Sequence, residues 1–477
     1  MDYKFKTEPY EHQRKALRKC WDKSYYALFM DMGTGKSKVL IDNAAILFLK
    51  KKIEGLLIVA PKGVYQNWIQ KEIPAHMPDY EIKAVAWSAS TTQRNLRSLE
   101  TLFEETGTFK ILIMNVEAFS TKKGTAFAER YLSKWKCMLA VDESTTIKSK
   151  NARRTKSLTK LAGLAPYRRI LTGSPVTRSP LDLFSQCEFL QKECLGQSSY
   201  WAYQNRYAKM IRRSVGTHTF NQIVGYQNLS ELNQLLEPFS FRVRKEDCLD
   251  LPDKVYTKRV VELTAPQKEA YRTMKSAALA IIDESMVSAP TVLTQLLRLQ
   301  QVCSGFVNMD DGTKKELPTN KTQELLSVVE EISGKAIIWG HFTNDILSIE
   351  KLLADKYGEE SCATFYGGTP TNDRQPIVDK FQDASSPLRF FIGQPRTGGY
   401  GLTLTEAKTV IYYSNGFDLE VRLQSEDRAH RIGQNNKVTY VDIVAEQTVD
   451  EKVLQALRSK IDISTQILAE GYKQWII

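Results

Sequence analysis

Two glycines, a lysine and a hydroxyl side chain lie between Met32 and Ser37, at a spacing that suits the binding of phosphate groups. An apolar run from Ala27 to Met30 precedes this segment, and helix-forming sequence follows it. Gly33 and Gly35 allow backbone N–H groups to turn toward a phosphate, and the start of a helix adds positive potential. The segment is therefore predicted to be a nucleotide phosphate loop, although Met30 occupies the position of the leading glycine in the usual pattern.

Two side chains of this phosphate loop match the chemistry of a nucleoside triphosphate and its metal ion. Lys36 is expected to reach the β- and γ-phosphates, and Ser37 is expected to ligate Mg²⁺. The alternative is a glycine turn with a surface lysine. The sequence disfavours that alternative because a buried strand and a helix are predicted on either side of the loop.

An acidic pair, Asp142 and Glu143, directly follows another apolar run, Cys137 to Ala140. Parallel α/β sheets place ligands at the carboxyl ends of their strands, so this pair is predicted to lie near the phosphate loop. Asp142 is expected to hold Mg²⁺ through water, and Glu143 to polarise the attacking water as a general base. An acidic surface turn is the alternative, and it loses weight because the pair ends a predicted buried strand.

Two arginines, Arg428 and Arg431, are three residues apart, so on a helix they would share one face. Two guanidinium groups presented together suit a γ-phosphate that carries developing charge. An arginine in that role is typically worth about 10³–10⁵ in rate. The spacing alone also fits a solvated basic helix face.

These candidate groups need a framework of buried strands, which two parts of the chain supply. In the first half the apolar runs are YYALFMDM, GLLIVAP, KILIMNV, CMLAVDE and RRILTGS; in the second half they are KAIIWGHF, SCATFYG, LRFFIGQ, TVIYYSN and VTYVDIVA. Polar or helix-forming sequence separates them, which is typical of parallel sheets covered by helices. The predicted fold is α/β, with one lobe at 1–190, a mainly helical insert and bridge at 191–320, and a second lobe at 321–477.

Composition places the chain among folded proteins with a basic excess. The 477 residues carry 66 Lys+Arg against 55 Asp+Glu, a formal charge of +11, which is compatible with a polyanionic partner. No apolar run has membrane-spanning length and the N-terminus does not read as a signal peptide, so no membrane association is expected. The 7 cysteines include no Cys-x-x-Cys pair and only 5 histidines are present, so no zinc site is expected.

Taken in order, these motifs resemble those of superfamily-two helicases, specifically the Swi/Snf-like double-stranded DNA translocases. DRAHRIGQ (427–434) is the most specific string; VDEST resembles the acidic motif, and DMGTGKS resembles a phosphate loop that in this branch also lacks the leading glycine. PYEHQ (9–13) resembles the adenine-recognition motif. The resemblance implies two RecA-like lobes with a helical insert, ATP in the cleft between them, Mg²⁺ as its metal, and DNA across the top of both lobes.

The same resemblance assigns roles to residues by position. The residues expected to bind ATP are Gln13, Gly33, Thr34, Gly35, Lys36, Ser37 and Gly401. The residues expected to contact DNA are Lys62, Asn67, Trp68, Phe342 and Arg396. The residues expected to couple hydrolysis to DNA contact are Thr172, Gly173, Ser174 and Gln424. For Trp68, packing in the core is an equal alternative.

Four positions depart from the pattern of this branch. Ser144-Thr145 replaces Ala/Gly-His after the acidic pair, Thr403 replaces an asparagine, Gln394-Pro395 replaces Ser-Thr, and Phe417 lies where a tryptophan is usual. The missing histidine normally helps to couple hydrolysis to DNA binding. The first departure therefore bears on that coupling, while the acidic pair itself is intact.

The expected function is that of an ATP-dependent motor moving on double-stranded or branched DNA. A strand-separating helicase, and a nucleotide-gated DNA-binding module with weak hydrolysis, stay as alternatives. The basic run 148–156 and the aromatic and basic segment 200–213 are further candidates for DNA contact, with a solvated face and core packing as their respective alternatives. A minimal monomeric motor of viral or bacterial type is expected, acting in the cytoplasm, or in the nucleus if the source is eukaryotic; its protein partners are not predicted.

Overall fold

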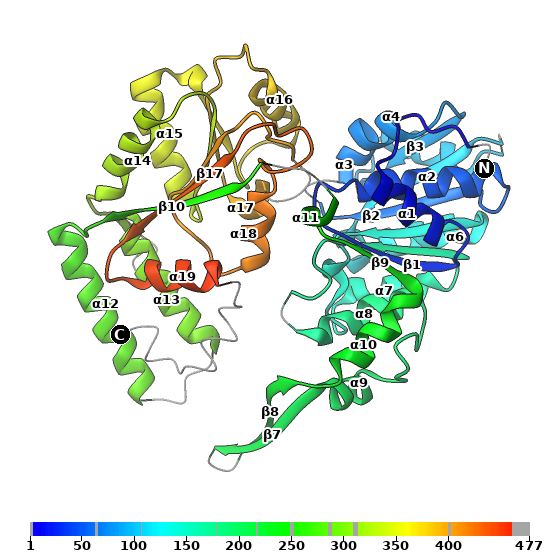
Figure 1. Ribbon diagram of the computed structural model, residues 1–477, viewed down its shortest axis with the longest axis horizontal. Coiled ribbons are helices and arrows are strands. Elements are labelled where there is room, and N and C mark those ends of the chain that lie inside the picture. Colours follow the sequence, from blue (N-terminus) through cyan, green and yellow to red (C-terminus); the bar gives the residue numbers. More distant parts are fainter. Residues whose placement is uncertain are drawn as a thin grey trace. The chain divides into compact units, whose positions relative to one another are not determined.

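The computed structural model describes residues 3–62, 65–105, 107–177, 179–215, 218–248, 252–284, 289–308, 313–398 and 402–459. The chain divides into two compact units, Met1–Asp250 and Leu251–Ile477, which we call lobe 1 and lobe 2 (Figure 1). The boundaries predicted at residues 190 and 320 stay predictions. Among the described residues, no helix has the length and apolar character needed to cross a membrane.

Lobe 1 is built on a seven-stranded sheet in the order β3-β4-β2-β5-β6-β1-β9, as far as the described residues show. Its strands are β1 (Tyr25–Met30), β2 (Gly55–Ala60), β3 (Ile82–Ala86), β4 (Phe109–Asn115), β5 (Cys137–Asp142), β6 (Tyr167–Leu171) and β9 (Ser240–Val243). Every pair of neighbours runs parallel. The central strands β2 and β5 are buried along their whole length, as continuous apolar runs covered on both faces must be.

Eleven α-helical segments belong to the described part of lobe 1. They are α1 (Glu11–Cys20), α2 (Lys36–Leu49), α3 (Tyr65–Asn67), α4 (Ile73–His76), α5 (Gln93–Glu100), α6 (Lys122–Lys134), α7 (Arg153–Ala162), α8 (Leu183–Leu190), α9 (Tyr200–Tyr207), α10 (Leu229–Leu236) and α11 (Lys245–Cys248). Helix α2, which follows the phosphate loop, is buried along most of its length. Its two internal charges, Lys38 and Asp42, pair with each other at 3.0 Å, which allows them to be buried.

The segment 191–320 contains more strand than its mainly helical interpretation predicted. Strands β7 (Ala208–Val215) and β8 (His218–Tyr226) pair as an antiparallel hairpin, and Figure 1 shows this hairpin extending away from the rest of lobe 1. Tyr203 and Tyr207 are buried on α9, as their helical spacing predicted, whereas Met210 lies on β7. Helix α9 ends at Tyr207, after which β-branched residues such as Ile211 and Val224 favour the extended hairpin.

Lobe 2 contains a six-stranded parallel sheet in the order β10-β17-β16-β13-β15-β14 within the described residues. Its strands are β10 (Lys254–Val261), β13 (Ala336–Trp339), β14 (Cys362–Phe365), β15 (Phe390–Gly393), β16 (Thr409–Tyr412) and β17 (Val438–Ala445). A short hairpin joins β11 (Phe306–Asn308) to β12 (Lys314–Glu316). Both lobes contain a parallel sheet and many helices, so the predicted α/β fold class with two parallel-sheet lobes is confirmed.

Both faces of the lobe 2 sheet are covered by helices. These are α12 (Ala265–Glu284), α13 (Ala289–Ser304), α14 (Asn320–Glu331), α15 (Thr343–Tyr357), α16 (Thr371–Gln382), α17 (Pro395–Gly398), α18 (Leu419–Glu426) and α19 (Val449–Arg458). Along β13, Ala336 and Ile338 belong to the core cluster that includes α13, α14, α15 and α19, whereas Ile337 and Trp339 belong to the cluster that includes α16. Alternate side chains therefore point into two separate apolar layers.

Candidate nucleotide-binding site

The phosphate loop connects the end of β1 to the start of α2 through two glycines in the left-handed region. Gly33 has φ +79° and Gly35 has φ +83°, conformations that favour glycine. A Cβ atom on Gly35 would also lie 2.1 Å from the Nε2 atom of Gln13. Met30 is fully buried at the end of β1, so the position of the missing leading glycine lies inside the strand and its side chain packs in the core. The loop keeps the tight turn that a phosphate site needs.

Helix α1 holds this loop from outside through two side chains. The Gln13 amide donates to Thr34 O at 3.0 Å, and its carbonyl accepts from Tyr10 N at 3.0 Å. The ring Nε2 of His12 also lies 2.8 Å from Thr34 O. Gln13 was predicted at the nucleotide site from the PYEHQ motif, whereas no role was predicted for His12. Both residues fix the backbone of the phosphate loop at Thr34.

The acidic pair at the end of β5 meets the phosphate loop, as its position at a strand end predicted. Lys36 Nζ lies 3.2 Å from Glu143 Oε1, and the two side chains are only 11% and 10% exposed. Glu143 has φ +48°, which turns the chain sharply after the strand. Glu143 N donates to Asp142 Oδ1 at 3.1 Å. Lys36, Asp142 and Glu143 therefore form one buried group from two distant parts of the sequence.

Burial governs the electrostatics of this group. It raises the pKa of the Asp142 carboxyl to about 7, and the negative charge of Glu143 acts in the same direction. The ammonium of Lys36 and a hydrogen bond from Trp68 act in the opposite direction. A buried carboxylate at this position is stabilised by a cation, and the oxygen ligands of Ser37 and Asp142 are of the kind that Mg²⁺ prefers. The residues thus fit a magnesium nucleotide.

Trp68 belongs to this buried group rather than to an open surface. Its side chain is 2% exposed, and its Nε1 donates to Asp142 Oδ2 at 3.2 Å. This position favours core packing over the DNA contact that the family resemblance implies. Sequence analysis could not place the indole beside Asp142, because the contact depends on the π-helical turn Trp68–Glu72 that follows α3.

The three predicted coupling residues of lobe 1 lie beside the phosphate loop. Thr172 is 1% exposed, its N–H donates to Leu28 O at 3.2 Å, and its hydroxyl accepts from Ser174 N at 3.2 Å. A Cβ atom on Gly173 would lie 3.2 Å from Met32 N, so the two loops are in close backbone contact. A movement of one of these two loops is therefore expected to displace the other.

In lobe 2, the two predicted arginines lie in turns instead of on a helix. Helix α18 ends at Glu426, and Arg428 N donates to Ser425 O in an i to i+3 turn, which breaks the helical spacing. The pair nevertheless converges, because Arg428 Nη1 and Arg431 Nη1 donate to the same carbonyl, Leu402 O, at 3.3 and 3.0 Å. The expected shared helix face is wrong, and the expected proximity is present.

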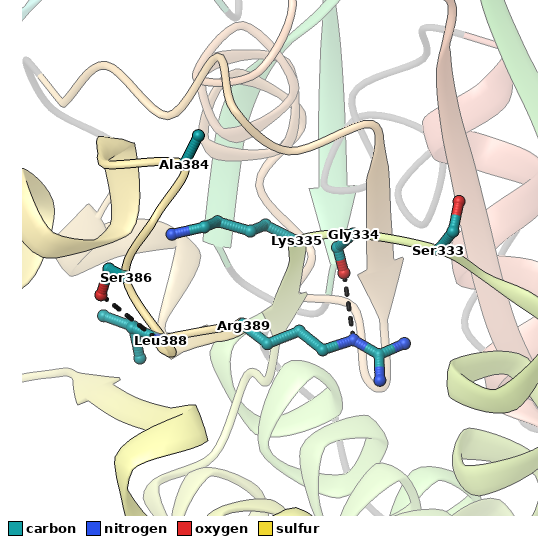
Figure 2. Close-up of a pocket in the computed structure, with 7 residues that line it drawn as sticks. All are labelled: Ser333, Gly334, Lys335, Ala384, Ser386, Leu388 and Arg389. Carbon is teal, nitrogen blue, oxygen red and sulfur yellow. Dashed lines mark hydrogen bonds between the residues drawn. The ribbon is translucent and has the colours of Figure 1, made fainter.

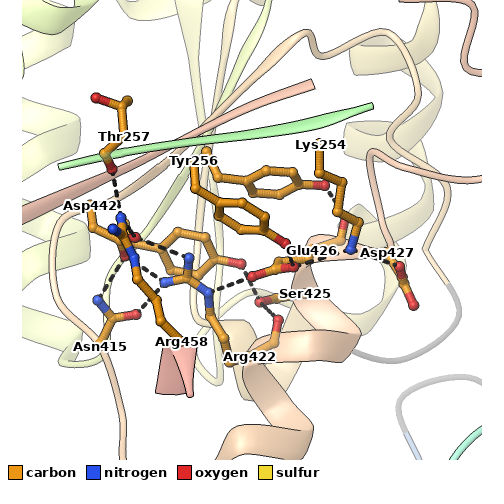
Figure 3. Close-up of polar contacts among 12 residues, drawn as sticks. Lys254, Tyr256, Thr257, Asn415, Arg422, Ser425, Glu426, Asp427, Asp442 and Arg458 are labelled. Atoms are coloured by element: carbon orange, nitrogen blue, oxygen red, sulfur yellow. Dashed lines mark hydrogen bonds and ion pairs between the residues drawn. The ribbon is translucent and has the colours of Figure 1, made fainter. Parts of the chain in front are cut away.

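A buried polar network holds the helix that precedes these arginines (Figure 3). Arg422 stacks on the Tyr412 ring at 3.4 Å and pairs with Glu426 at 2.9 Å and Asp442 at 2.5 Å. Lys254, near the start of lobe 2, pairs with Glu426 at 3.1 Å. These contacts fix α18 against the sheet, so the turn that carries the two arginines starts from a rigid base.

Replacing Asp442 with alanine is expected to destabilise lobe 2 by about 3–5 kcal/mol, because it removes one carboxylate of a buried ion-pair network and leaves Arg422 paired with Glu426 alone. Asp442 is fully buried and also accepts from Asn415 and Arg458. Urea unfolding followed by circular dichroism measures the change. The control is Arg259→Ala, which removes a surface pair with Glu331 and is expected to cost no more than about 1 kcal/mol. Equal effects for the two variants would contradict the structural role of the network.

The remaining predicted residues lie at several places within the two lobes. Lys62 is exposed just after β2, and Asn67 is half-buried on α3. Arg396 is 78% exposed and lies 3.7 Å from Asp418, while Phe342 packs edge-on against Phe306 with ring centroids 5.3 Å apart. Of these side chains, those of Lys62 and Arg396 are exposed at the surface.

Two other predicted residues belong to lobe 2: Gln424 was expected to couple hydrolysis to DNA contact, and Gly401 was expected to bind ATP. Gln424 is 5% exposed, donates to Glu420 at 3.1 Å, and keeps a buried Oε1 without a hydrogen-bond partner among the described residues. Gly401 lies outside the described residues. Gln394, which departs from the family pattern, donates to Thr343 Oγ1 at 3.3 Å and so connects the end of β15 to the start of α15. Burial lowers the pKa of neighbouring His341 to about 4.

A hollow of about 460 Å³ in lobe 2 does not have the features of a phosphate site (Figure 2). It lies at the amino ends of β13 and β15, whereas parallel sheets bind ligands at the carboxyl ends. Its cations are engaged by main-chain carbonyls: Arg389 donates to Gly334 O at 3.0 Å, and Lys335 to Asp383 O at 2.6 Å. These bonds fasten the loop after α14 to the sheet.

Two family models match successive parts of the chain, and these parts contain the motifs described above. Residues 12–306 match the model of the SNF2-related domain, and residues 320–433 match the helicase conserved C-terminal domain. The first match contains the phosphate loop and the acidic pair. The second contains both arginines of the DRAHRIGQ string.

Relatives of the chain occur in bacteria and in eukaryotes. A putative ATP-dependent helicase/translocase, YwqA, of Bacillus subtilis is 26% identical over 94% of this chain and 46% of its own length. The SWI/SNF chromatin-remodeling complex subunit snf22 of Schizosaccharomyces pombe is 25% identical over 92% of this chain and 26% of its own length. The chain thus spans less than half the length of these two relatives. Among solved structures, the Sulfolobus solfataricus SWI2/SNF2 ATPase core in complex with dsDNA aligns over 99% of this chain and 96% of its own length, with a TM-score of 0.44 and 22% identity.

Proposed function

The chain belongs to the family of SNF2-related domains, and from this premise we propose that it is an ATP-driven motor that moves on double-stranded or branched DNA. The observation that carries the proposal is the buried contact of Lys36 with Glu143 beside Asp142, at the end of a phosphate loop. A phosphate-binding lysine, a metal-binding carboxylate and a carboxylate base are the groups that hydrolysis of a nucleoside triphosphate requires in lobe 1.

In this mechanism the chain's own residues bind the phosphates and move one proton. Backbone N–H groups around Gly33 and Gly35 and the start of α2 bind the phosphates. Ser37 and Asp142 would hold Mg²⁺, which supplies charge neutralisation at the β- and γ-phosphates when it is bound. Glu143 orients the attacking water and accepts its proton.

Because of the ion pair between Lys36 and Glu143, nucleotide binding must precede general-base catalysis. While Lys36 Nζ lies 3.2 Å from Glu143, the carboxylate is neutralised and cannot act as a free base. Binding of a triphosphate draws the ammonium toward the β- and γ-phosphates, and the carboxylate is then released for general-base catalysis. Nucleotide binding itself therefore activates Glu143.

Contact with DNA is proposed for exposed and partly exposed cations that follow strands at the carboxyl edges of the sheets. Lys62 follows β2, the basic run 148–156 follows the acidic pair, and Arg396 follows β15. Lysines and arginines at such positions suit phosphates of the DNA backbone, which provide most of the salt-dependent affinity and no sequence specificity. The names of the relatives, a helicase/translocase and a chromatin-remodeling subunit, support a DNA motor of this kind.

A comparison of nucleic acids tests the proposal. ATP turnover is measured with duplex DNA, forked DNA, single-stranded DNA and RNA, and movement is measured by displacement of a third strand from a triplex. We expect stimulation by duplex or forked DNA and triplex displacement without separation of a plain duplex. Separation of the duplex would indicate a strand-separating helicase, and turnover at background with every nucleic acid would indicate a nucleotide-gated binding module. Stimulation by RNA alone would overturn the proposal.

Replacing Lys62 with alanine is expected to weaken duplex binding and to reduce its salt slope by about one unit, because one phosphate contact is lost. Fluorescence anisotropy at several salt concentrations measures the slope. Lys136→Ala is the matched control, since Lys136 is also exposed but precedes β5, at the amino edge of the sheet. An unchanged slope for the Lys62 variant would remove this residue from the DNA interface.

A further inference from the structure

Ser144, the residue after the acidic pair, is fully buried and forms a hydrogen bond with a residue that is distant in the sequence. Its Oγ donates to Gln186 Oε1 at 2.6 Å. Gln186 lies on α8 and is also fully buried. A short bond between two buried polar groups is costly to break, because each partner would lose its compensation away from water. The acidic pair is therefore tied to helix α8.

The amide nitrogen of Gln186 is hydrogen-bonded to the segment LTGSP (171–175), which contains the predicted coupling residues and which we call the coupling loop. Gln186 Nε2 donates to Pro175 O and to Asp182 O, both at 2.8 Å. Pro175 closes the LTGSP segment, whose Gly173 is in close backbone contact with Met32 of the phosphate loop. Both amide hydrogens and the amide oxygen of Gln186 are thus engaged. Ser144 and Pro175 cannot shift relative to each other without losing one of these bonds.

A second set of contacts joins the start of the basic run to the same part of lobe 1. Lys148 Nζ donates to the Thr177 hydroxyl. The N–H and hydroxyl of Thr177 donate to Asp182 Oδ2 at 3.0 and 2.9 Å. Asp182 immediately precedes α8 and is the residue whose carbonyl accepts from Gln186. The basic run, the coupling loop and the acidic pair therefore converge at the first turns of α8.

We propose that Gln186 is the positioning residue that couples the nucleotide site to the DNA-contacting loops of lobe 1. When Lys36 moves from Glu143 to a phosphate, the Lys36–Glu143 ion pair is broken and the sharp turn at Glu143 loses this constraint. The resulting shift of Ser144 is passed through the Gln186 amide to Pro175 and to the start of the basic run. The inference rests on the proposed function, since it assigns a route for its ATP–DNA coupling.

Replacing Gln186 with leucine tests the route, because leucine has a similar volume and removes every hydrogen bond of the amide. We expect the ratio of duplex-stimulated to basal ATP turnover to fall on the order of tenfold, which is within the usual range of coupling between two sites. The control is Gln267→Leu in lobe 2. Gln267 is also fully buried and also donates to main-chain carbonyls, Val302 O and Cys303 O, but it lies on α12 and has no predicted role at the nucleotide site. We expect its ratio to stay at the wild-type value.

Ser144→Ala, alone and combined with Gln186→Leu, separates coupling from stability. The double variant is expected to have no lower ratio than Gln186→Leu alone, because both substitutions break the same link. Its resistance to urea is expected to recover in part toward the wild-type value, since the Ser144 hydroxyl no longer lacks its acceptor, while Pro175 O and Asp182 O still lack the amide donor. A ratio that recovers along with stability would show a merely structural role and overturn the inference.

The results also distinguish a failure of the proposed motor function from a failure of the role proposed for Gln186. If no nucleic acid raises the turnover of the wild-type protein, the proposed function fails and the inference fails with it. If duplex DNA raises the turnover of wild type, Gln186→Leu and Ser144→Ala by the same factor, the motor stands and only the role of Gln186 is overturned. Should Gln186→Leu fail to fold, the ratio for Ser144→Ala decides alone.

Discussion

Glu143→Gln is expected to lower ATP turnover by about 10²–10⁴-fold, the usual contribution of a general base, while ATP binding is kept. Glutamine has nearly the shape of glutamate but cannot accept a proton from the attacking water. Its carbonyl oxygen can still accept a hydrogen bond from Lys36, which now lies 3.2 Å from the carboxylate. The phosphate loop and Asp142 are unchanged in this variant. The loss therefore falls on the chemical step.

Two measurements establish this pattern. Turnover is followed at saturating duplex DNA, and affinity is measured with a fluorescent ATP analogue. The comparison variant is Lys36→Ala, which is expected to lose both turnover and nucleotide affinity, because it removes the side chain of the phosphate loop that is predicted to contact the β- and γ-phosphates. Turnover near the wild-type level in Glu143→Gln would remove Glu143 from the mechanism, whatever its affinity for ATP.

The proximity of Lys36 and the acidic pair in lobe 1 was predictable because these residues lie at the ends of buried strands. Strands β1 and β5 are continuous apolar runs, and the carboxyl ends of parallel strands meet at one edge of a sheet. That rule alone brings Lys36 toward Glu143 across a separation of more than a hundred residues. Met30 was an apparent defect of the loop pattern, and its burial within β1 explains why a glycine is not needed there.

Contacts that depend on the path of irregular segments were not predictable in the same way. The indole of Trp68 reaches Asp142 only because a π-helical turn follows α3. Arg428 and Arg431 converge on Leu402 O through turns, although their spacing indicated a helix. The bond of Ser144 to Gln186 joins residues 42 positions apart and leaves no local pattern in the sequence. These cases share a cause, since none follows from the period of a helix or strand.

The position of Ser144 in the structure gives a physical role to one residue of the acidic motif that departs from the family pattern. As a sequence, Ser144-Thr145 indicated only that a histidine usual in this branch is missing. In the structure, the Ser144 hydroxyl is buried and bonded to an amide that also holds Pro175. The substitution therefore introduces a polar link between the acidic motif and the coupling loop. Whether hydrolysis and DNA contact communicate through this link is the question that the Gln186 variants answer.

Arg431→Ala is expected to reduce ATP turnover by about 10³–10⁵-fold, the usual effect of removing an arginine that stabilises the charge developing on a transferred phosphoryl group. Of the two arginines, Arg428 is 3% exposed and bonded to two carbonyls, Gln424 O and Leu402 O, which is typical of a structural side chain. Arg431 is half-buried. It is therefore the better candidate to leave Leu402 and reach a phosphate.

The test compares Arg431→Ala, Arg431→Lys and Arg428→Ala for turnover, ATP affinity and urea stability. Arg431→Ala is expected to lose turnover with stability and ATP affinity largely kept, because the phosphate loop of lobe 1 is intact. Arg431→Lys is expected to recover little, since an ammonium cannot reproduce the planar fork of a guanidinium. Arg428→Ala is expected to lose stability, because its buried bonds hold the turn after α18. If Arg431→Ala lost stability and turnover in proportion, the residue would be a second fastening of Leu402 and the catalytic arginine would have to lie elsewhere.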